Sequence, residues 1–298
     1  MNAPKTYTYK TVGDCAIQAD VTAPSQGTGP FPVLVQIHGG ALISGSRTQF
    51  NDPEQALFLE AGFVLVAIDY RLAPETKLAQ IIEDIQDAFR WIRAEGPALF
   101  QADPERIAVW GQSAGGYLTL MTGICVEPKP KALVSFYGYG DLIGDWYSKP
   151  DPFYCQQPMV SLEESGKRVS TPVISERTFN GGPKEKFYIY CRQQGTWPLE
   201  VSGHDPKDDT GFFTPYCPVQ NVSKAYPPTF LAHGDKDTDV PYEQSKMMAK
   251  ELTRHGVPRR FITIPGGGHC FDGAWDQPIV QETFAEMVKF LRKHVLGG

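Results

Sequence analysis

Short apolar runs recur along the chain and alternate with longer segments of helical periodicity. Six runs are rich in β-branched and aromatic residues and are apolar on both sides: PVLVQIHGG, GFVLVAIDY, RIAVWGQS, KALVSFYG, PPTFLAHGD and RRFITIPGG. Strands of this kind belong inside a parallel sheet that is covered on both faces. Two earlier runs, TYTYKTV and CAIQADVTAP, alternate polar and apolar residues around a Gly-Asp turn, which predicts an antiparallel pair at the start.

Three segments that accompany these runs have the spacing of amphipathic helices: LAQIIEDIQDAFRWIRAEG, VPYEQSKMMAKELTRHG and QETFAEMVKFLRKHVLGG. The first places apolar residues along one stripe: Ile81, Ile85, Ala88, Phe89 and Ile92. We expect this helix to stop at Gly96 and Pro97. Strands joined by helices through right-handed crossovers form a doubly wound sheet, so the pattern predicts an α/β fold with a mostly parallel central sheet and helices on both faces.

The alternation breaks between residues 140 and 226, where the chain is rich in Pro, Gly and aromatic residues. Structureless loops of this length are uncommon. We therefore predict a main domain formed by residues 1–139 and 227–298, with residues 140–226 inserted as a cap over the carboxyl edge of the sheet. The aromatic residues of the cap line an apolar pocket in one interpretation and form its own small core in the other. The pocket candidates are Trp146, Tyr147, Phe153 and Tyr154.

Composition and charge narrow the possible partners. Of the 298 residues, 41% are hydrophobic and 21% are charged, and the net charge of -6 includes no basic block. This balance argues against nucleic acid and anionic membrane surfaces as partners. The start MNAPKTYTYK lacks the apolar core of an export signal, and the longest apolar run covers only Phe63–Ile68, so we expect a cytoplasmic protein without integral membrane association. The oligomeric state stays open.

One serine lies on a tight corner between two glycines. In GQSAG, Gly111, Ser113 and Gly115 follow the apolar run RIAVW and precede the helix-like run YLTLMTGICV. A serine at a turn from a buried strand into a helix lies at the carboxyl end of the sheet, with its hydroxyl exposed to substrate. We therefore predict that Ser113 is a nucleophile; the alternative is a small-residue turn with an inert serine.

A serine nucleophile needs a base and an acid that orients the base. Of the six histidines, His269 follows the last strand in TIPGGGHCFD, on a glycine-rich loop suited to a base that enters a cleft. The acid is expected after the preceding strand, where Asp235, Asp237 and Asp239 alternate. Spacing alone does not rank the three, although Asp239 is placed to help cap the following helix. A cation site is the other interpretation of this cluster, but it lacks the loop with a terminal Glu that such calcium sites use.

Small residues at the end of an earlier strand offer backbone donors for the charge that develops on a substrate carbonyl. In VQIHGGALISG, the segment from His38 to Ala41 contains Gly39 and Gly40, and its N–H groups can point at one spot together with that of Ala114. The alternative is a plain strand-ending glycine turn.

Taken together, these motifs resemble the α/β-hydrolase fold, and within it the esterases similar to hormone-sensitive lipase. The resemblance rests on the order Ser, Asp, His, on GQSAGG and HGGA, and on DYRLAPE at Asp69–Glu75. It covers the main domain and leaves the cap uncovered. It implies that Asp237, four residues after the histidine of HGDKD, is the triad acid. It also implies that Gly40, Ala41 and Ala114 form the oxyanion hole, and that DYRLAPE braces their loop.

The sequence departs from that family in two places. Ala41 stands where a third glycine is usual, and its methyl group is expected to narrow the acyl site. The family usually carries its cap at the N-terminus, whereas the insertion here is at residues 140–226.

The predicted function is a serine hydrolase that cleaves a carboxylic ester or related acyl bond of a small molecule through an acyl-enzyme. The same machinery also serves a lactonase, a thioesterase, an arylformamidase or a peptidase, and a ligand-binding receptor derived from a hydrolase is the alternative of another class. No metal or organic cofactor is expected. Cys270, beside the predicted base, is expected to be a buried, inert thiol rather than a redox-sensitive one.

Overall fold

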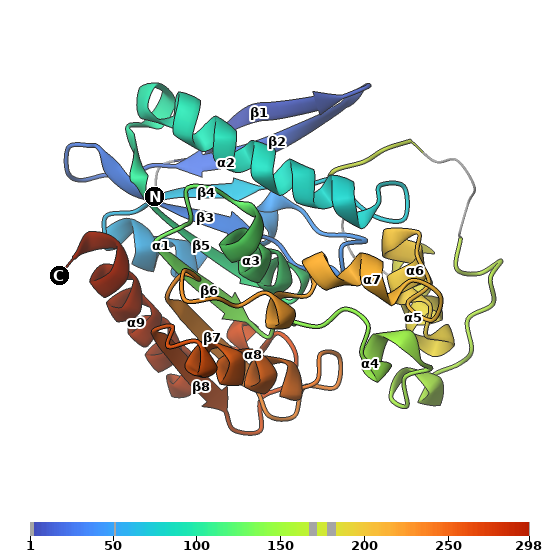
Figure 1. Ribbon diagram of the computed structural model, residues 1–298. Helices are drawn as coiled ribbons and strands as arrows, with labels where there is room; N and C mark the ends of the chain where they lie inside the picture. Colours follow the sequence, from blue (N-terminus) through green and yellow to red (C-terminus); the bar gives the residue numbers. More distant parts are fainter. Residues whose placement is uncertain (1–2, 51, 167–171, 178–182, 298) are drawn as a thin grey trace.

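Eight strands form one mixed sheet in the order β1-β2-β4-β3-β5-β6-β7-β8. The computed structural model describes residues 3–50, 52–166, 172–177 and 183–297 (Figure 1). The strands are β1 Lys5–Val12, β2 Cys15–Thr22, β3 Phe31–Ile37, β4 Val64–Ile68, β5 Ala102–Gln112, β6 Ala132–Phe136, β7 Thr229–Gly234 and β8 Arg259–Ile264. From β4 to β8 all neighbours pair in parallel, and β1 and β2 pair antiparallel, which confirms the predicted sheet.

Helices cover both faces of the sheet because its central strands are apolar on both sides. In β3, Val33, Val35 and Ile37 belong to one buried cluster and Leu34 to the other. The first cluster is covered by α2 Leu78–Phe100, α3 Ala114–Cys125 and α8 Glu243–Arg254, and the second by α1 Asp52–Glu60 and α9 Pro278–Leu291. None of the helices among the described residues has the length and apolarity needed to span a bilayer.

The predicted end of α2 is wrong by one turn. The helix passes through Gly96 and Pro97 and ends at Phe100. Proline this close to the end of a helix removes only one backbone hydrogen bond. Continuing the helix buries Phe100 against aromatic rings of β1 and α2. The helix is capped by Gln101, which has a left-handed backbone conformation and donates its N–H to the carbonyl of Gly96.

The chain between β6 and β7 forms short helices that lie together beyond one end of the sheet (Figure 1). They are α4 Asp145–Ser148, η2 Tyr154–Gln156, α5 Pro183–Gln194, α6 Trp197–Ser202, α7 Thr210–Phe213, η3 Thr214–Tyr216 and η4 Pro218–Gln220. These helices belong to the predicted cap, residues 140–226. The division of the chain into a cap and a main domain stays a prediction.

Candidate active site

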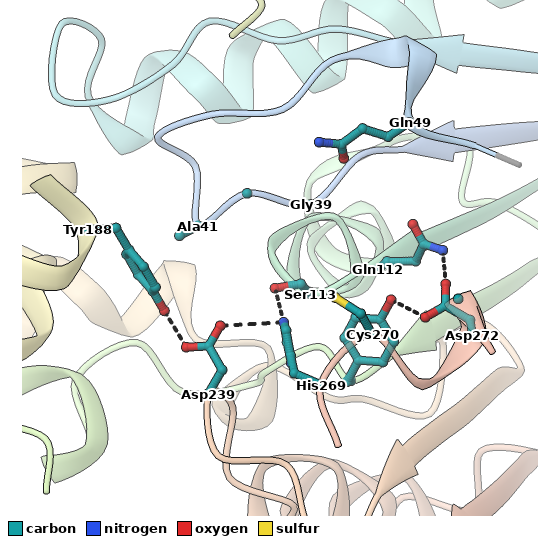
Figure 2. Close-up of a pocket in the computed structure, with 13 residues that line it drawn as sticks. Gly39, Ala41, Gln49, Gln112, Ser113, Tyr188, Asp239, His269, Cys270 and Asp272 are labelled. Atoms are coloured by element: carbon teal, nitrogen blue, oxygen red, sulfur yellow. Dashed lines mark hydrogen bonds and ion pairs between the residues drawn. The ribbon is translucent and has the colours of Figure 1, made fainter. Parts of the chain in front are cut away.

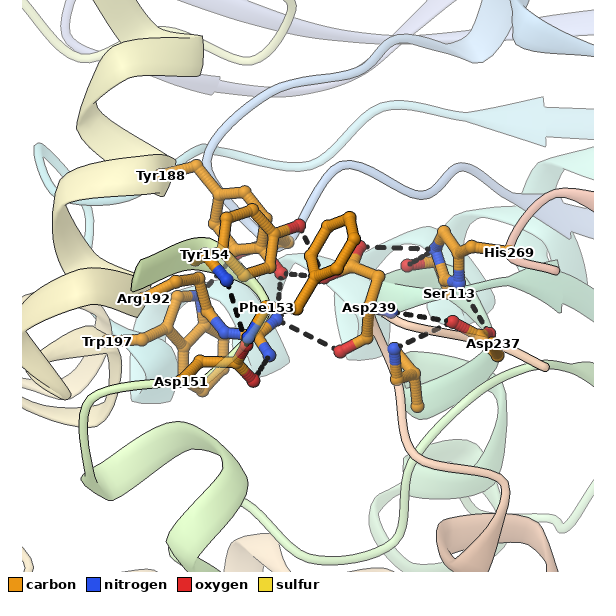
Figure 3. A network of polar contacts seen from close by, with 12 residues as sticks. Ser113, Asp151, Phe153, Tyr154, Tyr188, Arg192, Trp197, Asp237, Asp239 and His269 are labelled. Atoms are coloured by element: carbon orange, nitrogen blue, oxygen red, sulfur yellow. Dashed lines mark hydrogen bonds and ion pairs between the residues drawn. The ribbon is translucent and has the colours of Figure 1, made fainter. Parts of the chain in front are cut away.

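Three side chains from separate loops meet in one hydrogen-bonded chain. Ser113 stands between β5 and α3, Asp237 follows β7, and His269 follows β8. Nε2 of His269 lies 3.1 Å from Oγ of Ser113, and Nδ1 of the same ring lies 2.7 Å from Oδ2 of Asp237 (Figure 3). The structure therefore brings together the three residues that the sequence placed far apart, in the order a nucleophile, base and acid require.

The backbone at Ser113 is strained. Its φ of 54° and ψ of -120° lie in a region that residues with a side chain rarely adopt. The flanking glycines are required, because a Cβ on Gly111 would collide with the carbonyl of Gly115, and a Cβ on Gly115 with the carbonyl of Ile37. The sharp turn lifts the Ser113 side chain out of the sheet at the start of α3.

Asp237 is held as a carboxylate by four donors. Its Oδ1 accepts the backbone amides of Asp239 and Val240, and its Oδ2 accepts both His269 and His233. Burial raises the pKa of Asp237, but the hydrogen bonds from His233 and His269 outweigh it and hold the pKa well below its usual range. A permanently ionised acid fixes the tautomer of His269, with its proton on Nδ1 and a lone pair directed at Ser113.

The imidazole of His269 is surrounded by acidic groups. Burial lowers its pKa, but the carboxylates of Asp239 and Asp237 outweigh burial and raise the pKa above 6.5. Tyr137 packs its ring edge-on against the imidazole, with 4.7 Å between centroids. The surroundings therefore favour the protonated form of the ring.

The oxyanion loop leaves its amides available. Gly40 and Ala41 have φ of 107° and 55°, and among the described residues neither donates its N–H to a hydrogen bond. The carbonyl of Ala41 accepts the indole N–H of Trp197 at 3.0 Å. Ala114 begins α3, where backbone N–H groups have no partner within the helix. These are the three donors that the family resemblance implies.

The DYRLAPE segment is hydrogen-bonded to the two ends of the oxyanion loop, at His38 and Leu42. The hydroxyl of Tyr70 donates to the carbonyl of His38 at 3.0 Å, and the two rings stack with centroids 4.2 Å apart. The amide of Ala73 donates to the carbonyl of Leu42 at 2.7 Å. These contacts have the bracing geometry that the resemblance implies.

A cavity of about 340 Å³ opens beside Ser113 (Figure 2). Besides the predicted site residues, it is lined by side chains that the sequence reasoning did not assign to it: Gln49, Gln112, Tyr137, Tyr188, Asp239 and Asp272. Several of these residues directly adjoin a motif residue or the end of a strand. That position is the sequence feature that could have identified them as lining the cavity. Cys270 also lines the cavity and is exposed, so the expectation that it is buried is wrong.

The four aromatic residues proposed for the pocket are not among the described residues that line this cavity. Tyr147 is buried between Trp146 and Trp197, with ring centroids 3.6 and 4.0 Å away. Phe153 is 43% exposed, and Tyr154 donates its hydroxyl to Asp239. For Tyr147 the structure has the alternative arrangement, a small core within the cap, because large rings bury more surface against one another than at an open cavity.

Asp239 does not cap the following helix. α8 begins only at Glu243, and the Asp239 carboxylate is turned toward the cap, where Tyr154, Tyr188 and Arg192 donate to it. Three side-chain donors satisfy this carboxylate better than one exposed helix end. Within the described residues there is no group of three or more His, Cys, Asp or Glu side chains arranged to hold a metal ion.

Comparison with known proteins adds to this geometry. The sequence matches the family model BD-FAE over residues 19–149, which contain the oxyanion loop and Ser113. It matches the prolyl oligopeptidase family over residues 188–297, which contain Asp237 and His269. One match therefore contains the predicted nucleophile and oxyanion loop, and the other contains the predicted acid and base.

Solved structures share the fold at low sequence identity. A Staphylococcus aureus protein of unknown function is 23% identical with a TM-score of 0.79, and the match covers 98% of this chain and 99% of that one. The esterase Est2 of Thermogutta terrifontis is 22% identical with a TM-score of 0.66, covering 98% and 92%. An acetyl ester-xyloside bifunctional hydrolase from Caldicellulosiruptor lactoaceticus is 21% identical with a TM-score of 0.69, covering 93% and 88%.

Curated relatives are much longer than this chain. The non-reducing polyketide synthase Preu6 of Preussia isomera is 29% identical over 300 residues, and the synthase ausA of Aspergillus calidoustus is 28% identical over 346 residues. These matches cover 90% and 98% of this chain but only 14% of each synthase. The chain therefore spans about one seventh of the length of these relatives.

The chain has the α/β-hydrolase fold, and Ser113, His269 and Asp237 are arranged in it as the nucleophile, base and acid of a serine hydrolase would be. Two separate stretches of the chain are similar to the BD-FAE and prolyl oligopeptidase family models, and each model matches less than half of the chain. The narrower relationship to hormone-sensitive lipase stays a prediction.

Proposed function

We propose that this protein hydrolyses a carboxylic ester of a small molecule through an acyl-enzyme on Ser113. The observation that carries the proposal is the continuous chain from Ser113 through His269 to Asp237, with contacts of 3.1 and 2.7 Å. A serine hydroxyl becomes a nucleophile when a neutral imidazole accepts its proton at this distance.

In the proposed mechanism, His269 takes the proton of Ser113 as the oxygen attacks the ester carbonyl. The negative charge that forms on the carbonyl oxygen is stabilised by the amides of Gly40, Ala41 and Ala114. The protonated His269 then donates to the leaving alcohol, and the acyl group stays on Ser113. Water, activated by the same imidazole, releases the acid and restores the serine.

Two observations favour a small acyl substrate. The cavity of about 340 Å³ lies at the lower end of the range for small-molecule sites. Est2 of Thermogutta terrifontis has solved structures with propionate and with butyrate bound. We therefore propose short-chain esters as the first substrates to test.

Ser113→Ala tests the proposal directly. The variant should lose hydrolysis of p-nitrophenyl butyrate and labelling by a fluorophosphonate probe, while Ser223→Ala, which alters an exposed serine in the cap, should keep both. Turnover by Ser113→Ala would contradict the proposal. Labelling of the wild-type protein without turnover of any ester would instead support the ligand-binding alternative.

A thioester is the second candidate substrate. It is favoured by the match of 90% of this chain to a segment of a polyketide synthase. The Ser113 chemistry would be the same, with a thiol as leaving group. Comparing kcat/KM for an oxygen ester and a thioester of the same acyl group separates the two candidates.

A further inference from the structure

The carboxylate of Asp239 divides its two oxygens between the cap and the base (Figure 3). Oδ1 accepts the hydroxyls of Tyr154 and Tyr188 at 2.9 and 2.6 Å and Nη1 of Arg192 at 2.6 Å. Oδ2 lies 3.5 Å from Nε2 of His269, the ring nitrogen that also faces Ser113. Asp239 is therefore oriented by the cap and directed at the reacting atoms.

The charges around Asp239 do not cancel. Arg192 is fully buried and binds Asp151 through Nη2 and Asp239 through Nη1, each at 2.6 Å. Two carboxylates therefore share one guanidinium, and the cluster keeps one net negative charge. Asp151 is buried, whereas Asp239 lines the cavity, so the excess charge faces the substrate at Asp239.

The leaving alcohol must lie on the same side of His269 as Asp239. His269 donates its proton from Nε2, so the oxygen of the departing alcohol lies within about 3 Å of that nitrogen. Oδ2 of Asp239 is 3.5 Å from Nε2 and borders the same cavity. A substituent two or three bonds beyond the leaving oxygen is therefore within reach of the carboxylate.

We propose that Asp239 is a specificity-determining residue that selects substrates whose alcohol portion carries a positive charge or hydrogen-bond donors. An alcohol with a negative charge is disfavoured by the same carboxylate. The inference rests on the proposed hydrolysis at Ser113, and it names the class of leaving group. In a purely structural role Asp239 would hold only the cap, and its loss would affect charged and neutral substrates equally.

Two esters of the same shape test the charge preference. Butyrylcholine and 3,3-dimethylbutyl butyrate differ in a quaternary nitrogen in place of a quaternary carbon. The wild-type protein should prefer butyrylcholine by about tenfold in kcat/KM, the factor that corresponds to about 1.4 kcal/mol. Asp239→Asn should reduce the preference to about twofold or less, mainly through slower use of the choline ester, since removing the charge removes the attraction.

The substitution is chosen to preserve the fold. Asparagine keeps an oxygen that accepts from Tyr154, Tyr188 and Arg192, and Arg192 stays neutralised by Asp151. Asp235→Asn is the matched control: it removes an equal charge from the same turn, at an exposed carboxylate that binds the amide of Gly266. The ester preference of this control should equal that of the wild type.

Several outcomes would overturn the inference. They are equal kcat/KM for the two esters in the wild-type protein, a preference that Asp239→Asn leaves unchanged, and an equal loss of preference in Asp235→Asn. Hydrolysis of p-nitrophenyl butyrate but of neither test ester would overturn it as well, because the site would then exclude such alcohols. Loss of ester hydrolysis altogether would instead contradict the proposed function.

A second measurement does not depend on a variant. Choline should inhibit p-nitrophenyl butyrate hydrolysis by the wild-type protein at lower concentration than 3,3-dimethylbutanol. Equal inhibition by the two alcohols would overturn the inference even if Asp239→Asn does not fold.

Discussion

Nε2 of His233 lies 3.1 Å from Oδ2 of Asp237, the same oxygen that binds His269. This nitrogen also lies 3.0 Å from the carbonyl of Val240, and since both partners are acceptors, Nε2 carries the hydrogen. The hydroxyl of Ser245 then donates to Nδ1 of His233. A buried histidine that ends a strand thus positions the acid of the candidate triad.

Replacing this donor should weaken the base. A hydrogen bond to a charged group contributes about 1.5–3 kcal/mol, so His233→Leu should lower kcat/KM for p-nitrophenyl butyrate about 10- to 100-fold. His233→Gln can still donate toward Asp237 and should lose less. Steady-state kinetics with both variants, together with their unfolding curves, checks the difference. Equal activity of His233→Leu and the wild type would contradict a positioning role.

The acidic surroundings of His269 predict an alkaline shift of the pH profile. Neutral imidazole is the active base, so kcat/KM should be high above the pKa of His269 and fall as pH decreases through it. Burial lowers this pKa, but Asp239 and Asp237 raise it by more than burial lowers it. The midpoint of the pH profile should therefore lie above 6.5. Asp239→Asn should move the midpoint to lower pH, and the Asp235→Asn control should move it less. A wild-type midpoint at or below 6.5 would contradict this arrangement.

The indole of Trp197 should support the oxyanion loop through one hydrogen bond. Trp197→Phe keeps a buried ring against Tyr147 but leaves the carbonyl of Ala41 without its donor. An unsatisfied buried acceptor costs about 1–3 kcal/mol, so urea unfolding should show this loss of stability and kcat should fall with it.

Trp146→Phe is the matched control for that experiment. Its indole nitrogen has no hydrogen-bond partner among the described residues, so the substitution removes no such bond. Stability and kcat should change less than in Trp197→Phe, and equal effects of the two variants would contradict the assigned hydrogen bond.

Cys270 should react slowly at neutral pH although it is exposed at the cavity. Although the residue as a whole is exposed, the protein atoms packed around its sulfur desolvate the thiol, and together with the carboxylates of Asp272 and Asp239 they raise its pKa to about 12. Since the thiolate is the reactive form, modification by iodoacetamide should speed up about tenfold per pH unit. Mass spectrometry of the Cys270 peptide follows the reaction, with Cys270→Ser as the unreactive control. Rapid modification at neutral pH would show that the pKa is not raised.

Much of the fold was predictable because its signals are local. Strands without a polar face require a covered parallel sheet, and the glycines around Ser113 require a turn that side chains would obstruct. The misplaced end of α2 shows the limit of such rules. Pro97 is a local stop signal, but the burial of Phe100 against distant rings outweighed it.

The surroundings of the site were less predictable. Spacing did not rank Asp235, Asp237 and Asp239, and only the family resemblance implied Asp237. The folded turn shows that Asp237 binds Nδ1 of His269 while Asp239 reaches Arg192. The aromatic residues of the cap have similar side chains, and nothing local distinguishes one that packs inside the cap from one that lines a cavity.

By itself, the sequence determined the alternation of strands and helices, the tight turn at Ser113, and the order in which a serine, an acid and a histidine follow the strands. Tertiary structure alone decided that Asp237 and Asp239 approach opposite nitrogens of His269, which side chains border the cavity, and that Arg192 joins the network. The physical reason is the range of the forces involved. Backbone propensity and periodic burial depend on neighbours in the chain, whereas a hydrogen bond between Asp239 and Arg192 exists only once packing brings them together.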